Sequence, residues 1–166
     1  MNIQITRNNL EAATNVSGEA VAREVKNAIE QACGSLTAET LTALNAEQVT
    51  LWAFFILHDE VMDGGFVQLI HNGYGPFFFR NPFTKAMQLW GIDTIVPIMR
   101  HAEKLYRKHG ADIEKPCSDE AFMALFEQFP QFDDLDDEFI EEEENICQAV
   151  GQYVTDHLER FVEVVN

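Results

Sequence analysis

Residues Ala46–Met62 read AEQVTLWAFFILHDEVM, and this stretch decides the fold. The run 49–57 inside it is apolar apart from one threonine. A helix with apolar side chains nearly all round is expected to be buried on every side. Asn45, with Gln48 three positions later, matches the capping box that opens a helix, and Gly64–Gly65 interrupts the chain beyond it. The sequence therefore predicts a buried central helix.

Helical patterning continues on both sides of this segment, with apolar residues at steps of three and four. Further helices are predicted from Ser17 to Gly34, over Ala38–Leu44, over Phe66–Ile70, from Asn81 to Gly91, from Asp93 to Gly110, from Ser118 to Pro130 and from about Asp134 to Val164. Asn81 and Asp93 are expected as N-caps and Gly110 as a helix end. No run of residues alternates as a strand does. The predicted fold class is all-α, a single compact domain over 1–166 with about eight helices and a long acidic C-terminal helix. Residues 1–16 are expected to form a partly ordered N-terminal segment.

The composition predicts a folded, reduced and cytoplasmic protein. The 166 residues are 46% apolar and include thirteen Phe, an aromatic content that disordered chains lack. The longest apolar run, Leu51–Leu57, is far shorter than the ~20 residues that span a bilayer, so no membrane association is expected. The N-terminus lacks the apolar core of a signal peptide. Cys33, Cys117 and Cys147 form no CxxC pattern, which is typical of a cytoplasmic protein.

The negative charge is concentrated near the C-terminus. Residues 1–111 carry eleven acids and nine bases, a net charge of -2, whereas residues 112–166 carry seventeen acids and two bases, a net charge of -15. The densest part is Asp133–Glu144, which reads DDLDDEFIEEEE and is acidic at nine of twelve positions. Acids that serve only solubility are expected to be spread along a chain. The segment 133–144 is therefore predicted to be an acidic surface.

On a helical wheel, residues Asp133–Val165 separate into two faces. Six apolar residues cluster on one face: Leu135, Phe139, Ile146, Val150, Tyr153 and Phe161. The opposite face carries four carboxylates at steps of three, four and three, which we call the acidic stripe: Asp134, Asp137, Glu141 and Glu144. A second row flanks the stripe: Asp133, Asp136, Glu138, Glu142 and Glu143. Three acids of the preceding helix are candidate extensions of this surface: Asp119, Glu120 and Glu127.

Two interpretations of the acidic stripe are open. Negative charge is favourable at a helix N-terminus, so a solvated helix face needs no partner. However, the acids continue beyond the first turn, and like charges four positions apart cost a helix about 0.2–0.5 kcal/mol each. Such a surface repels nucleic acid and attracts a basic protein surface through electrostatic steering.

A helix rises about 1.5 Å per residue, so the stripe is about 15 Å long with charges about 5–6 Å apart. One strand of B-DNA carries a phosphate about every 3.4 Å, a comparable charge density. The functional hypothesis is competition with DNA for a DNA-binding protein.

Two other functional hypotheses remain. An acidic inhibitor or immunity protein for a basic nuclease or toxin needs the same charge. An enzyme could use Glu60, His58 and Gln68 near the two glycines, although no catalytic motif is present.

No metal ligands and no cofactor are predicted from the sequence. The calcium-loop pattern started at Asp134 meets Phe139 where Gly is required and Asn145 where Glu is required. The five histidines show neither the His–His nor the Glu-x-x-His spacing of helical metal sites.

Residues 60–75 read EVMDGGFVQLIHNGYG. This segment resembles a bacterial family of domains whose recurring pattern is Glu, then Asn/Asp-Gly-Gly-Phe-x-Gln, an aromatic or aliphatic pair, and Asn-x-x-Gly. The resemblance extends loosely over residues 46–106, and with its size and acidity the chain resembles the DMP-type DNA-mimic proteins of that family. The resemblance implies an all-α fold, a homodimer, no catalysis, and binding to the DNA-binding face of a helix-turn-helix transcription factor. It also implies a tight helix junction at Gly64–Gly65, where Glu60 and Gln68 would bond exposed backbone.

Overall fold

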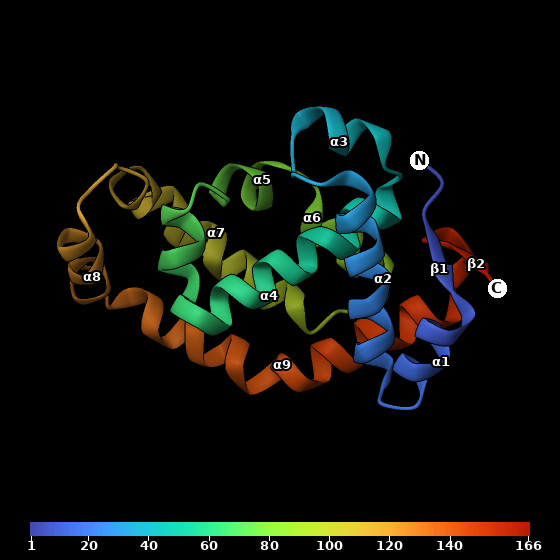
Figure 1. Ribbon diagram of the computed structural model, residues 1–166. Coiled ribbons are helices and arrows are strands. Elements are labelled where there is room, and N and C mark those ends of the chain that lie inside the picture. Colours follow the sequence, from blue (N-terminus) through green and yellow to red (C-terminus); the bar gives the residue numbers. More distant parts are fainter. The chain divides into compact units, whose positions relative to one another are not determined.

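A computed structural model describes all 166 residues and confirms an all-α fold with nine α-helices (Figure 1). One short 3-10 helix and two three-residue strands complete it. The elements run in this order: β1 (Gln4–Thr6), α1 (Arg7–Thr14), α2 (Gly18–Cys33), α3 (Ala38–Ala43), α4 (Ala46–His71), α5 (Gly75–Arg80), α6 (Phe83–Leu89), α7 (Ile95–Ile113), α8 (Asp119–Gln128), α9 (Gln131–Asp156), η1 (Leu158–Arg160) and β2 (Glu163–Val165). No helix is both long enough and apolar enough to cross a membrane.

The chain divides into two compact units. The first comprises Met1–Phe55 and Asn145–Asn166, and the second comprises Ile56–Glu144. Both boundaries fall inside a long helix, one in α4 and one in α9. The single domain expected from the sequence stays a prediction.

The first unit buries the start of α4 as the sequence predicts. The Asn45 and Gln48 side chains each accept a hydrogen bond from the other's backbone N–H, at 2.9 and 3.0 Å, which confirms the capping box. The Gln48 amide also donates to the carbonyl of Phe161 at 2.7 Å, so a buried polar group is satisfied. The apolar run of α4 in this unit is buried: Leu51, Trp52, Ala53, Phe54 and Phe55.

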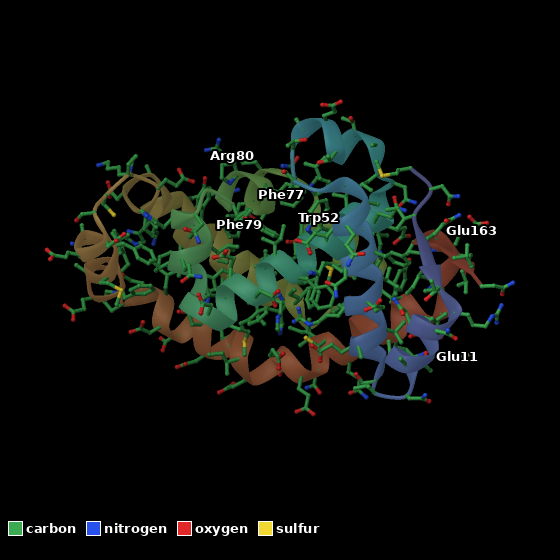
Figure 2. The ribbon with its side chains drawn as sticks, viewed as in Figure 1. Glu11, Trp52, Phe77, Phe79, Arg80 and Glu163 are labelled. Carbon is green, nitrogen blue, oxygen red and sulfur yellow. The ribbon has the colours of Figure 1, made fainter.

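The C-terminal end of the chain differs from the prediction. The last long helix was expected to reach Val164, but α9 ends at Asp156 and is followed by η1. Residues 163–165 instead form a parallel ladder with residues 4–6. Glu163 lies at the start of β2 (Figure 2). Its carboxylate accepts hydrogen bonds from Asn2 at 2.8 Å and from Gln4 at 3.1 Å. Strands of three residues are too short to produce an alternating pattern, and their pairing joins opposite ends of the chain.

The second unit contains the remaining part of α4, helices α5 to α8 and the first half of α9. Within α4, Gly64 and Gly65 have non-helical backbone angles, so the predicted interruption is confirmed. In α5, the Phe78 ring is buried and packs edge-on against Phe83 at 4.9 Å between centroids. Phe77 and Phe79 are half-buried on the same short helix (Figure 2).

Three predicted helix boundaries in the second unit are wrong. Pro82 is the residue before α6, and the Asn81 amide reaches back to the Pro76 carbonyl instead of capping the helix. Helix α7 begins after Thr94, and Asp93 contributes only its backbone carbonyl.

Helix α7 also continues past Gly110 to Ile113. A Cβ at Gly110 would lie 2.5 Å from the ring of Tyr106, so this glycine makes room for an aromatic side chain one turn earlier. Close packing, rather than a helix end, explains the glycine.

Candidate functional site

Helix α9 presents the acidic stripe on its solvent-facing side. The helix begins at Gln131, directly after Pro130, and its first turn contains Asp133 and Asp134, whose charge favours a helix N-terminus. All four stripe residues are exposed: Asp134, Asp137, Glu141 and Glu144. The apolar residues predicted on the opposite face of this helix are buried, apart from the half-buried Tyr153: Leu135, Phe139, Ile146 and Val150. The amphipathic helix predicted from the sequence is confirmed.

The charge of the stripe is not balanced within the chain. None of the four carboxylates takes part in an ion pair of the structure. The nearest base in sequence before α9 is Lys115, which pairs with Asp112 at 3.1 Å. An exposed row of carboxylates that takes part in no ion pair produces a negative potential that extends about 8–10 Å at physiological salt.

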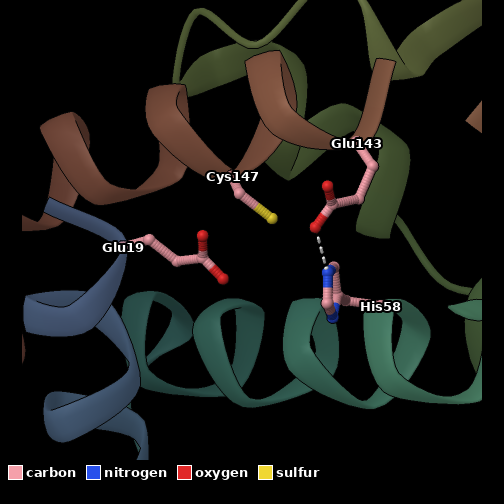
Figure 3. A group of neighbouring side chains, drawn as sticks. All are labelled: Glu19, His58, Glu143 and Cys147. Atoms are coloured by element: carbon pink, nitrogen blue, oxygen red, sulfur yellow. Dashed lines mark hydrogen bonds and ion pairs between the residues drawn. The ribbon is translucent and has the colours of Figure 1, made fainter. Parts of the chain in front are cut away.

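The second row divides into exposed and inward-facing carboxylates. Asp133 is exposed, whereas Asp136, Glu138, Glu142 and Glu143 are half-buried. Within the second unit, Glu138 Oε1 lies 3.1 Å from Nδ1 of His101 on α7. Glu143 Oε1 lies 2.6 Å from Nε2 of His58 on α4 (Figure 3). These residues hold α9 against its neighbours, and the outward charge is therefore carried mainly by the stripe.

Asp136 has a structural task at the glycine junction. Its carboxylate accepts the backbone N–H of Phe66 at 2.9 Å, where the second part of α4 begins. Gly65 has φ +71°, and a Cβ at this position would collide with the Asp136 carboxylate. An aspartate from α9 therefore caps the restarted helix, and only glycine leaves room for it.

The hydrogen bonds of Glu60 and Gln68 differ from those that the resemblance implies. They were expected to bond exposed backbone at the junction, but the Gln68 amide donates to the Glu60 carboxylate at 3.0 Å and to Asp63 at 2.9 Å. Asn72 donates to the same Glu60 oxygen at 2.9 Å. The backbone N–H is bonded by Asp136 instead. The polar residues of the motif thus form their own side-chain network across the junction.

His58, Glu60 and Gln68, which an enzyme could use, do not converge on one another as a site. His58 lies between two carboxylates, with Nδ1 2.8 Å from Asp59 and Nε2 2.6 Å from Glu143. Glu60 instead accepts from the amides of Gln68 and Asn72. The three residues of that hypothesis are therefore engaged in two separate structural networks.

The candidate extensions of the surface lie on α8. Ser118 caps this helix by accepting the Ala121 N–H at 3.2 Å, as predicted. All three acidic residues that were proposed as extensions are exposed: Asp119, Glu120 and Glu127.

Comparison with known proteins places these features in a family. Residues 42–157 match the DMP19-like proteins, a range that includes the glycine junction, α8 and the whole acidic stripe. The chain belongs to the DMP19-like protein family. The DNA mimic protein DMP19 of Neisseria meningitidis serogroup B (strain ATCC BAA-335 / MC58) is 35% identical over 127 residues, which cover 76% of this chain and 77% of that relative. The resemblance found in the sequence is thereby confirmed.

Asp136 is expected to make the stability of this DMP19-like protein depend on pH. Burial raises the pKa of its carboxyl from the ordinary 3.8 to about 6; the Phe66 N–H opposes this shift, and the charges of Asp133 and Asp137 add to it. A raised pKa means that the folded chain binds the proton more tightly than the unfolded chain. Stability is therefore expected to fall as pH rises from about 4 to about 6.

Asp136→Asn is expected to remove this loss, because the amide oxygen still accepts the Phe66 N–H without carrying charge. At pH 7.5 the variant is expected to exceed the wild type in free energy of unfolding by on the order of 1–2 kcal/mol, after allowance for solvent screening. At pH 4 the two proteins should be equally stable. Urea unfolding at both pH values measures the difference, and a difference that is the same at pH 4 and pH 7.5 would contradict the assignment to Asp136.

Two features of the surface were not predicted from the sequence. The inward orientation of Asp136 and Glu143 depends on partners 70 and 85 positions away, which no local pattern reveals. The exposure of Ile140 could have been predicted from the sequence, because this apolar residue lies three positions after Asp137 and four before Glu144.

Proposed function

We propose that this DMP19-like protein is an acidic DNA mimic that binds the DNA-binding face of a transcription factor and blocks its binding to DNA. The observation that carries the proposal is the exposed acidic stripe, in which four carboxylates at regular helical steps take part in no ion pair. Phosphates of a DNA strand likewise present regularly spaced negative charge to a basic protein surface. The name of the Neisseria relative, a DNA mimic protein, supports the same function.

The stripe is held ready for binding. The contacts of Asp136, Glu138 and Glu143 fix α9 against other elements of the second unit. A charged surface on a fixed helix loses less conformational freedom on binding than the same charges on a flexible segment. The protein is proposed to work without catalysis and without direct contact to nucleic acid.

We infer that the target is a helix-turn-helix factor, which the resemblance implies. Such factors bind DNA as dimers, with half-sites about 34 Å apart. A homodimeric mimic would present two stripes to such a target. Analytical ultracentrifugation tests this part of the proposal, because a chain of 18.9 kDa should sediment with twice that mass. A monomer at all concentrations would contradict the proposed homodimer.

We also propose that the protein acts in the cytoplasm, where such factors bind DNA in bacteria.

Capture from a cell lysate tests the identity of the partner. The wild type and a variant with four lysines in the stripe are immobilised side by side, and retained proteins are identified by mass spectrometry. A transcription factor retained only by the wild type is the expected result. Selective retention of a basic nuclease or toxin instead would contradict the proposal and favour the alternative, an acidic inhibitor or immunity protein for that enzyme.

A further inference from the structure

The acidic surface contains exposed apolar side chains. Six large apolar residues are exposed in the chain: Met1, Val16, Met62, Leu89, Met123 and Ile140. Ile140 lies on α9 and is 52% exposed, and Met123 lies on α8 and is 66% exposed. Single exposed apolar residues are common on proteins, so their surroundings decide whether they have a function.

Ile140 lies beside the acidic stripe. It follows Asp137 by three positions and precedes Glu144 by four, and residues at such spacing are neighbours on the surface of a helix. The other large aliphatic residues of α9 are buried: Leu135, Ile146, Val150 and Val154. The exposure of Ile140 therefore sets it apart from every other large aliphatic side chain of this helix.

The same arrangement occurs on α8. Met123 follows Asp119 by four positions and Glu120 by three, and it precedes Glu127 by four. All four side chains are exposed and share one helix face. On both helices of the proposed binding surface, an apolar side chain is thus surrounded by carboxylates.

Carboxylates alone do not select a partner. In protein–DNA complexes, phosphate contacts supply affinity that is independent of sequence, whereas contacts to base edges supply specificity. A surface with only negative charge would attract many basic proteins. DNA-binding faces also carry apolar groups that contact the methyl group of thymine. An apolar side chain among phosphate-like charges can occupy such a position.

We propose that Ile140 and Met123 are specificity contacts of this surface, and that they pack against the apolar groups with which the transcription factor contacts base edges. The inference rests on the proposed function. In it, the stripe supplies the attraction, and the two apolar side chains distinguish a DNA-binding face from any other basic surface. In protein interfaces a few residues that become fully desolvated carry most of the binding energy.

Alanine substitution tests the inference in the full-length chain. The probe is the purified helix-turn-helix domain that the wild type displaces from a fluorescent operator duplex, and a decalysine peptide serves as a purely electrostatic second probe. Ile140→Ala is expected to weaken binding to the domain by about 5- to 10-fold, because roughly half of an isoleucine remains to be buried. Met123→Ala should have a similar effect. Binding to decalysine should not change.

Leu89→Ala is the matched control, because Leu89 is 73% exposed on α6 outside the acidic surface. It should leave both affinities unchanged. The dependence of binding on salt should be the same for Ile140→Ala and the wild type, since no charge is removed.

The outcomes separate the inference from the proposed function. If four lysines in the stripe abolish binding while Ile140→Ala and Met123→Ala bind the domain as tightly as the wild type, only the inference is wrong. Equal weakening with both probes would also overturn it. If the wild type displaces DNA from no helix-turn-helix domain, the proposed function and the inference are both wrong.

Discussion

Simultaneous replacement of the stripe residues by lysine is expected to weaken displacement of DNA from the transcription factor by more than about 100-fold. The replaced residues are Asp134, Asp137, Glu141 and Glu144. Like charges facing each other across an interface cost several kcal/mol, and about 1.4 kcal/mol corresponds to a tenfold change in affinity. A competition assay with a labelled operator duplex measures the effect.

The fold should survive this change, because all four side chains are exposed and form no ion pair. Lysine at position 134 relieves the repulsion from Glu138, and lysine at position 137 relieves that from Asp133, at about 0.2–0.5 kcal/mol per pair. The lysines introduced at positions 137 and 141 repel each other as the two acids did. The loss of favourable charge in the first turn offsets part of that gain. The midpoint of thermal unfolding is therefore expected to stay within a few degrees of the wild type.

A control variant changes the net charge equally at another place. It replaces four exposed acids outside the surface by lysine: Glu11, Glu39, Asp93 and Glu159. This variant should still displace DNA. Equal loss in both variants would show that only the total charge matters, and full activity of the stripe variant would refute the assignment of the stripe.

Gly151→Ala is expected to give the largest loss of stability among single substitutions of a glycine in the first unit. A Cβ at Gly151 would collide with the carbonyl carbon of Gly18 and would lie 2.5 Å from the backbone nitrogen of Glu19. These are backbone atoms at the start of α2, so they cannot turn aside as a side chain does. Overpacking of this kind typically costs 1–3 kcal/mol, and sometimes more.

Helix propensity predicts the opposite sign for this substitution. In an exposed helix, Gly→Ala stabilises by about 1 kcal/mol. Because the Cβ at position 151 has no space, we expect a net loss of about 2 kcal/mol, or about 4–8 °C in the unfolding midpoint. Gln148→Ala on the exposed side of the same helix should change stability by less than about 0.5 kcal/mol. A rise in the midpoint for Gly151→Ala would contradict the close contact between the two glycines.

The helices that the sequence predicts well are those with local signals. The capping box at Asn45 and Gln48, the Ser17 and Ser118 caps and the Gly64–Gly65 interruption each depend on residues within a few positions. These signals specify their structures without help from distant parts of the chain. They account for the starts of α2, α4 and α8 and for the break inside α4.

The errors have two kinds of cause. Gly110 has a local one, because it makes room for the Tyr106 ring one turn earlier in the same helix and does not end that helix. Residues 163–165 have a distant one, because they leave the predicted helix to pair with residues 4–6 near the other end of the chain. The same cause limits the prediction of the site. Helical spacing identifies the outward stripe, whereas the inward use of Asp136 and Glu143 depends on Phe66 and His58.

The most direct test of DNA mimicry is whether the protein and DNA exclude each other on one transcription factor. The transcription factor is first saturated with a labelled operator duplex. The concentration of this protein that displaces half of the duplex is then measured at increasing concentrations of the duplex. If both ligands occupy the same face, this concentration rises in proportion to the DNA, and native mass spectrometry detects only the two binary complexes. A half-displacement concentration independent of DNA, or a ternary complex of factor, DNA and this protein, would contradict the account.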